Sequence, residues 1–179
     1  TLGVRMFRIF VISLLLALLS SQAWAEKADR DKPIEIEADT VTSNDAKKTS
    51  IYSGNVVLTQ GTLRIKGDKL VVREDTAGFQ HGTSYGNPTS FRQKREGKDE
   101  YIEGSGQRIE YDGRMDKVQL FTKAWVKRGN DIVHGDYIMY DANAEYSEVI
   151  GGGPKSATPA TPGGRVKAII QPKNQPDSK

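Results

Sequence analysis

The chain has 179 residues, with 26 Lys and Arg residues against 23 Asp and Glu residues and a formal net charge of +3 at pH 7. Its length suits one domain, with or without tails. Because it contains no cysteine and only two histidines, a disulfide scaffold, a thiolate zinc site and a cysteine nucleophile are excluded, and most histidine-based zinc or hydrolase sites are disfavoured. The small net charge does not indicate a nucleic-acid partner, and we expect none.

The first residues have the pattern of a secretory signal peptide. A basic region precedes the apolar stretch 9–19, and Ala23-Trp24-Ala25 places small residues at the positions that a signal peptidase reads. The apolar stretch is shorter than the ~20 residues that a membrane-spanning helix needs. We therefore predict a cleaved signal peptide at residues 1–25, with an uncleaved membrane anchor as the less favoured alternative, and then a charged, mobile segment at residues 26–32.

The centre of the chain is predicted to be all-β. From Pro33 to Ile150, short β-rich runs that alternate at period two, such as Tyr52–Gln60 and Lys117–Lys127, are separated by Gly, Asp and Asn turns. This pattern favours an antiparallel domain over residues 33–150. A linker rich in Gly and Pro (151–164), a terminal strand (165–170) and a disordered tail (171–179) are expected to follow it.

The β region contains an internal repeat. The segment Tyr52–Val72 aligns without a gap with Leu120–Tyr140, so that Gly61 aligns with Gly129. A shorter unit of a small, a polar, a variable and an aliphatic residue recurs at Ala38–Val41, Gly67–Leu70, Gly106–Ile109 and Gly135–Ile138. Stacked β-hairpins are typical of such repetition, and Asp39, Asp68 and Asp136 are expected to be turn residues.

Four segments resemble a known family: Ile36–Asp39, Gly54–Val72, Gly86–Phe91 and Gly135–Asp141. They are similar to the OstA-like family, the periplasmic bridge component (the A component) of the lipopolysaccharide transport system. The resemblance implies a semi-open antiparallel β-jellyroll of stacked hairpin-like repeats, without enzymatic activity, cofactor or metal. It also implies a role in the periplasm, carrying lipopolysaccharide by its lipid A acyl chains. The implied partners are lipopolysaccharide, the inner-membrane bitopic and ABC transporter subunits, the N-terminal domain of the outer-membrane translocon, and further copies of the same chain joined head-to-tail.

The apolar faces of the predicted strands supply the candidate lipid-binding residues. These are Ile34, Ile36, Val56, Leu58, Leu70, Val72, Phe91, Ile109, Tyr111, Leu120, Ile138 and Tyr140. By the resemblance, Phe91 and Tyr111 match aromatic or apolar interior positions of the family, and Ile34 and Ile36 match its first strand. Tyr85 and Trp125 are further candidates, although Trp125 is out of phase with its neighbours and is expected on the outer face. Periodicity alone leaves open whether these faces form a plain packed core or a lipid groove.

The polar candidates are weaker. His81 lies in a segment rich in turn residues that we expect to be a loop, and His134 lies on a strand; neither has the context of a metal ligand. The basic residues Arg92, Lys94 and Arg95, together with Lys123, Lys127 and Arg128 around Trp125, either meet the phosphates of a lipid head group or form a solvated rim. Nearby Glu96, Asp99 and Glu100 weaken the first interpretation.

Two other classes of function remain open from the residues. One is a secreted β-sandwich module with a dry core that binds carbohydrate or has a structural role. The other is a glycan hydrolase that uses Glu35 and Glu37, although the repeat does not support it because its second copy lacks such a pair. The terminal strands 33–38 and 165–170 are expected to leave open edges, which suit head-to-tail pairing.

Overall fold

The computed structural model describes residues 29–172, apart from 77, 96, 114–116, 142–143, 145 and 153–163. The predicted signal peptide at residues 1–25, most of the predicted linker and residues 173–179 of the predicted tail lie outside the described residues. Within the described ranges, no helix is long and apolar enough to cross a membrane.

The described chain is almost entirely β-structure, as predicted. A short 3-10 turn, η1 (Asp29–Asp31), precedes the strands. The strands are β1 (Ile34–Glu37), β2 (Thr40–Asn44), β3 (Thr49–Gln60), β4 (Leu63–Asp75), β5 (Gly78–Lys94), β6 (Tyr101–Asp112), β7 (Lys117–Arg128), β8 (Asp131–Asp141), β9 (Tyr146–Ile150) and β10 (Lys167–Ile169).

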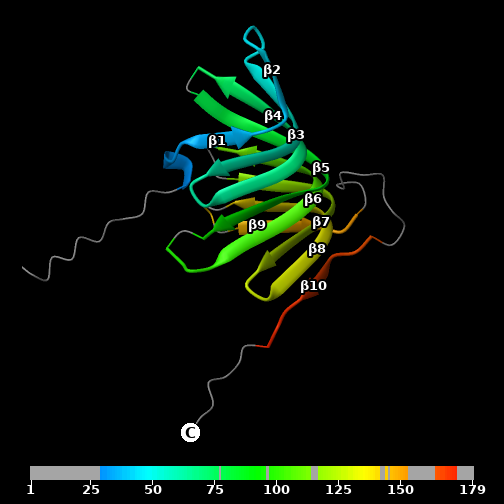
Figure 1. Cartoon of the computed structure of the whole chain (residues 1–179). Helices are drawn as coiled ribbons and strands as arrows, with labels where there is room; N and C mark the ends of the chain where they lie inside the picture. The colour runs from blue at the N-terminus through cyan, green and yellow to red at the C-terminus, as the bar shows by residue number, and fades with distance from the viewer. Residues whose placement is uncertain are drawn as a thin grey trace, which may run out of the picture.

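The described strands belong to one antiparallel, 10-stranded sheet in which consecutive strands from β2 to β9 pair (Figure 1). The order is β1-β3-β4-β5-β6-β7-β8-β10. At one edge, β1 and β2 both pair with β3, and at the other edge β9 and β10 both pair with β8. The two edges do not pair with each other, so the sheet is open, as the resemblance implied.

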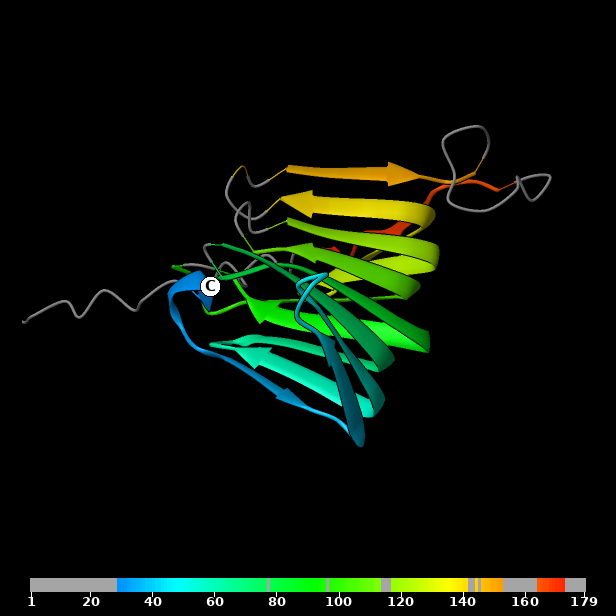
Figure 2. The ribbon, with the colours of Figure 1, turned by 90° about the horizontal axis from the view of Figure 1, so that it is seen from above.

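A row of bends crosses the sheet and folds it onto its own apolar face. The register shifts in the middle of every pairing from β3–β4 to β7–β8. The shifted residues are 54–55, 67–68, 86–88, 106–107, 122–123 and 136. Because a bulge bends a strand, each long strand runs through two facing halves, which we name the β1/β10 half and the β2/β9 half after their edge strands. Figure 2 shows the bends on the right of the molecule.

The recurring four-residue unit marks these bends. Asp68 and Asp136 lie inside β4 and β8, at the register shifts, and not in turns between strands. The expectation that they are hairpin-turn residues is therefore wrong. The reason is that the flanking residues pair on both sides of each bend, so the chain continues in the same sheet after it changes direction.

The internal repeat is confirmed as two matching hairpins. The β3–β4 hairpin turns at residues 61–62, with Gln60 opposite Leu63, and the β7–β8 hairpin turns at residues 129–130, with Arg128 opposite Asp131. Gly61 and Gly129 both have a φ of 58°. Glycine adopts this left-handed conformation without a steric penalty, which allows a two-residue turn.

The predicted loop around His81 is a strand. Residues 78–94 form β5, which pairs with β4 on one side and with β6 on the other. Its Gly and Pro residues predicted a loop, but Gly86 and Pro88 lie at the bend of this strand. The pairing on both sides supplies the hydrogen bonds that a strand needs, whatever its local propensity.

Side chains from both halves form one hydrophobic core. Its buried members are Val56, Leu58, Leu63, Ile65, Leu70, Val72, Phe91, Ile102, Ile109, Tyr111, Val118, Leu120, Ala124 and Ile138, each 0–3% exposed. Such low exposure means that these side chains are almost completely covered by other atoms. The core therefore fills the space between the two halves.

The bend in β4 provides a test of this architecture. A methyl group added at Gly67 would overlap Ser84 Oγ and lie 2.8 Å from the Tyr85 carbonyl oxygen. We expect Gly67→Ala to lower the free energy of unfolding by about 1–3 kcal/mol, measured by urea titration. Lys66→Ala is the matched control, because Lys66 is the residue next to Gly67 and its side chain is exposed. Equal stability of the two variants would contradict a tightly packed bend.

Candidate functional site

The folded sheet brings the predicted lipid-binding residues together in one interior. The buried ones come from β3 to β8 and belong to the core: Val56, Leu58, Leu70, Val72, Phe91, Ile109, Tyr111, Leu120 and Ile138. Ile34, Ile36 and Tyr140 pack against this core and are only partly buried. The interior is thus a single apolar surface that runs through the whole stack of strands.

This surface is most accessible at the two ends of the stack. Ile34, Ile36 and Tyr52 are partly buried beside the β1–β2 edge, and Tyr140 and Val149 are partly buried beside the β9 edge. Between these ends the described core side chains are 0–3% exposed. Access to them therefore requires entry at an end or separation of the two halves.

Opposite the bends, strand ends of the two halves face each other at a side that we name the mouth. Here Tyr111 of the β2/β9 half donates a hydrogen bond of 3.3 Å to Gln60 Oε1 of the β1/β10 half. Gln60 and Gln93 are buried polar residues, 5% and 6% exposed. Neither was among the predicted site residues, although Gln60 continues the inward face of Val56 and Leu58.

The η1 turn binds at the mouth through Asp29. Thr62 donates to this carboxylate from its backbone N at 2.8 Å and from Oγ1 at 2.6 Å, and Gln93 Nε2 donates to it at 3.0 Å. Gln60 Nε2 donates to the Lys32 carbonyl oxygen at 3.1 Å. The described part of the segment 26–32, which the sequence predicted to be mobile, is therefore attached to the sheet.

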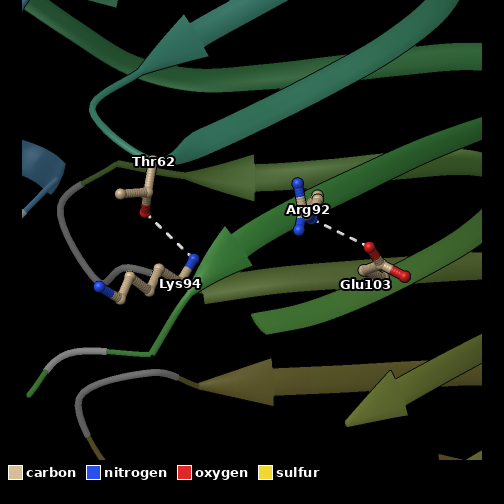
Figure 3. A network of polar contacts seen from close by, with 4 residues as sticks. All are labelled: Thr62, Arg92, Lys94 and Glu103. Carbon is tan, nitrogen blue, oxygen red and sulfur yellow. Dashed lines mark hydrogen bonds and ion pairs between the residues drawn. The ribbon is translucent and has the colours of Figure 1, made fainter. Parts of the chain in front are cut away.

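The basic residues of β5 lie beside acidic partners. Arg92 Nε is 2.9 Å from Glu103 Oε1, and Arg95 Nη1 donates to Glu100 Oε2 at 2.6 Å. The Arg92 guanidinium also lies 3.8 Å from the centre of the Tyr101 ring. Figure 3 shows the Arg92–Glu103 pair and the backbone N of Lys94 donating to Thr62 Oγ1 at 3.1 Å. Each of these two arginines therefore lies beside an acidic residue, and the exposed Arg92–Glu103 pair contributes little to stability because water and salt screen it.

The two additional aromatic candidates are on the outer face. Tyr85 is 41% exposed, and Lys69 Nζ lies 5.8 Å from its ring centre. Trp125 lies between Ala124 and Val126, which pack on the core, so it points outward as predicted. Tyr85 therefore does not line the interior. The inward position just before the bend is occupied by its neighbour Ser84, which is buried.

One cation and two aromatic rings lie in a row on the outer face of the β2/β9 half. The Arg108 guanidinium lies 3.9 Å from the centre of the Phe121 ring, and that ring lies 5.2 Å from the Tyr137 ring. Burial raises the pKa of the Tyr137 hydroxyl, and the negative charges of Glu148 and Glu110 raise it further. Tyr137 therefore remains neutral and donates to Gln119 Oε1 at 2.9 Å.

His81 and the paired carboxylates Glu35 and Glu37 lie on different strands, β5 and β1. His81 Nδ1 is 3.6 Å from Asp112 Oδ2 at the exposed surface. Glu35 and Glu37 are exposed on the outer face of the edge strand β1. Among the described residues, no group of three or more His, Cys, Asp or Glu side chains is arranged to hold a metal ion.

Comparison with known proteins agrees with this geometry. Residues 35–146 match the family described as LptA/(LptD N-terminal domain) LPS transport protein. The lipopolysaccharide export system protein LptA of Escherichia coli is 33% identical over 145 residues, which are 75% of this chain and 76% of that protein. LptH of Pseudomonas aeruginosa is 29% identical over 167 residues, 92% of this chain and 94% of that protein.

The fold agrees as well. The crystal structure of LptH, described as the LptA homologous periplasmic component of the lipopolysaccharide transport device, matches with a TM-score of 0.73 and 28% sequence identity. The match covers 82% of this chain and 100% of the LptH chain. On the sequence match, the shared open jellyroll and its continuous apolar interior, the chain belongs to the LptA/(LptD N-terminal domain) family of lipopolysaccharide transport proteins.

Proposed function

We propose that this protein binds lipopolysaccharide through its lipid A acyl chains and carries it across the periplasm, as one unit of a protein bridge between the two membranes. Family membership and the names of the relatives support lipopolysaccharide transport. The observation that carries the lipid-binding part is the single apolar interior, which extends from the partly exposed Ile34 and Ile36 to the partly exposed Tyr140.

The physical need for such an interior is large. Each methylene group exposed to water costs about 0.8 kcal/mol, so a chain of a dozen methylenes costs on the order of 10 kcal/mol. An apolar interior that continues from one end of the sheet to the other lets the acyl chains advance without passing through water. The role is one of binding and transfer, and we propose no catalytic step or cofactor.

The head group requires an open side. Sugars and phosphates lose their hydration in an apolar interior, which is unfavourable unless every lost hydrogen bond is replaced. The head group therefore stays outside while the acyl chains lie inside. At the mouth, the head group outside the jellyroll connects to the acyl chains inside it.

The open edges suit contacts with partners of the same fold. Strand β1 carries Glu35 and Glu37 on its outer face, and strand β10 at the other edge carries Lys167. Pairing of β10 with β1 of the next copy places opposite charges side by side and continues the interior. We propose this head-to-tail contact, with the inner-membrane transporter subunits at one end of the bridge and the N-terminal domain of the outer-membrane translocon at the other.

Lipid binding is tested at the two accessible ends of the interior. We expect Ile36→Asp and Tyr140→Asp to weaken lipopolysaccharide binding by about 10- to 100-fold, the factor for losing one large apolar contact. Tyr85→Asp is the outer-face control and is expected to bind as the wild type does. Affinity is measured by titration of purified protein, with circular dichroism confirming that each variant is folded.

The same experiment separates the transporter from a dry β-sandwich module. A protein that binds the lipid in its native state gains thermal stability as the lipid is added. If the folded wild type shows neither saturable binding nor a rise in Tm, the lipid-carrier proposal is wrong and the dry module stands. Equal loss in Tyr85→Asp and the interior variants would move the site to the outer face.

Head-to-tail assembly is tested by charge reversal. We expect Lys167→Glu to weaken self-association on the order of tenfold, because it places like charges opposite each other at the β10–β1 contact. Adding Glu35→Lys and Glu37→Lys to the same chain is expected to restore assembly. Sedimentation velocity over a range of concentrations measures both. Unchanged assembly of Lys167→Glu would rule out this pairing of edges.

A further inference from the structure

We propose that residues Asp29–Lys32, which we name the strap, form a gate over the mouth that must release before acyl chains enter the interior from the side. This inference rests on the proposed function and adds a route of entry and the residues that control it. The strap lies across from the bends of the sheet, at the left of Figure 2.

The strap is held by a compact set of polar contacts. The Asp29 carboxylate accepts hydrogen bonds from the Thr62 backbone N and Oγ1 and from Gln93 Nε2, at 2.8, 2.6 and 3.0 Å. Lys32 N donates to the Asp29 carbonyl oxygen at 3.0 Å, which closes the turn. One carboxylate thus ties the strap to the β3–β4 turn and to the end of β5.

A second contact extends this attachment across the mouth. The Gln60 amide donates to the Lys32 carbonyl oxygen at 3.1 Å through Nε2, and its Oε1 accepts from Tyr111 at 3.3 Å. Gln60 belongs to the β1/β10 half and Tyr111 to the β2/β9 half. The strap therefore orients the Gln60 amide, which joins the two halves. This contact lies at the mouth, where the head group has to emerge.

These contacts suit a releasable closure better than a permanent one. None of the strap side chains that the structure describes belongs to the hydrophobic core, and β1, which follows the strap, pairs with β3 over four residues only. Segments with few apolar contacts open locally at low free-energy cost. Beneath the strap, Gln60 and Gln93 present amide groups that suit the hydroxyl and phosphate groups of a lipid head group. The strap occupies the hydrogen-bonding positions that such a head group would use.

The chain is well suited to a cross-linking test because it contains no cysteine. The variant Asp29→Cys with Thr62→Cys replaces side chains whose oxygens lie 2.6 Å apart, and a short thiol cross-linker then fixes the strap. We expect the cross-linked protein to take up lipopolysaccharide from micelles at least tenfold more slowly than the wild type. The same variant without cross-linker is expected to take it up faster, by on the order of tenfold, because the charged hydrogen bonds are lost.

A matched control places the same cross-link away from the strap. Ser43→Cys with Ser50→Cys joins β2 to β3, where the two hydroxyl oxygens lie 3.0 Å apart at an exposed site. Cross-linking there is expected to leave the uptake rate unchanged. Uptake at the wild-type rate after the strap is cross-linked would overturn the gate, whereas absence of binding by the wild-type protein would overturn the proposed function itself.

A pair of glycine variants checks the gate without any cross-linker. An added methyl group at Gly61 overlaps Asp29 Oδ1, whereas at Gly129 it lies 3.3 Å from Glu100 Oε1. Both glycines have a φ of 58°, so the two substitutions share the same backbone strain. We expect Gly61→Ala, but not Gly129→Ala, to speed uptake and to raise hydrogen exchange in residues 56–63. Equal behaviour of the two variants would contradict the gate.

Discussion

The row of bends across the sheet is the constraint on which the rest of the structure depends. A 10-stranded antiparallel sheet with one apolar face has to cover that face, and this chain covers it by folding every long strand at the same level. The fold turns one sheet into two facing halves and makes the apolar face an interior. It also fixes where that interior is open, because the bends close one side and the unpaired edges leave both ends free.

The polar groups of the protein are arranged around this interior by the same geometry. Hydrogen bonds gather at the mouth, where Gln60 and Tyr111 meet, and charges lie on the outer faces, where Arg92 and Glu103 meet. Under the proposed function, this arrangement matches a lipid that is part hydrocarbon and part sugar phosphate, with an apolar interior for the chains and a polar perimeter for the head group.

The core of the protein is densely covered, with its buried side chains 0–3% exposed. Under the proposed function, lipid entry into this core is therefore coupled to separation of the two halves. The partly exposed apolar residues lie at the ends of the stack, next to the edges proposed for assembly. When two copies meet at these edges, the partly exposed apolar residues of one copy therefore contact those of the next. The contact removes the apolar surface of both from water.

The sequence by itself determined the strand class, the two matching hairpins and the inward residues such as Leu58 and Ile109, because alternation at period two and turn glycines are local properties. It did not reveal that Gly67-Asp68 and Gly135-Asp136 lie at bends within strands, that His81 lies in a strand, or that Asp29 is attached at the mouth. Those outcomes depend on pairing partners far away in the chain. Tertiary structure alone decided that Gln60 and Tyr111 meet, because only the folding of the sheet at its bends brings strands that do not pair with each other into contact.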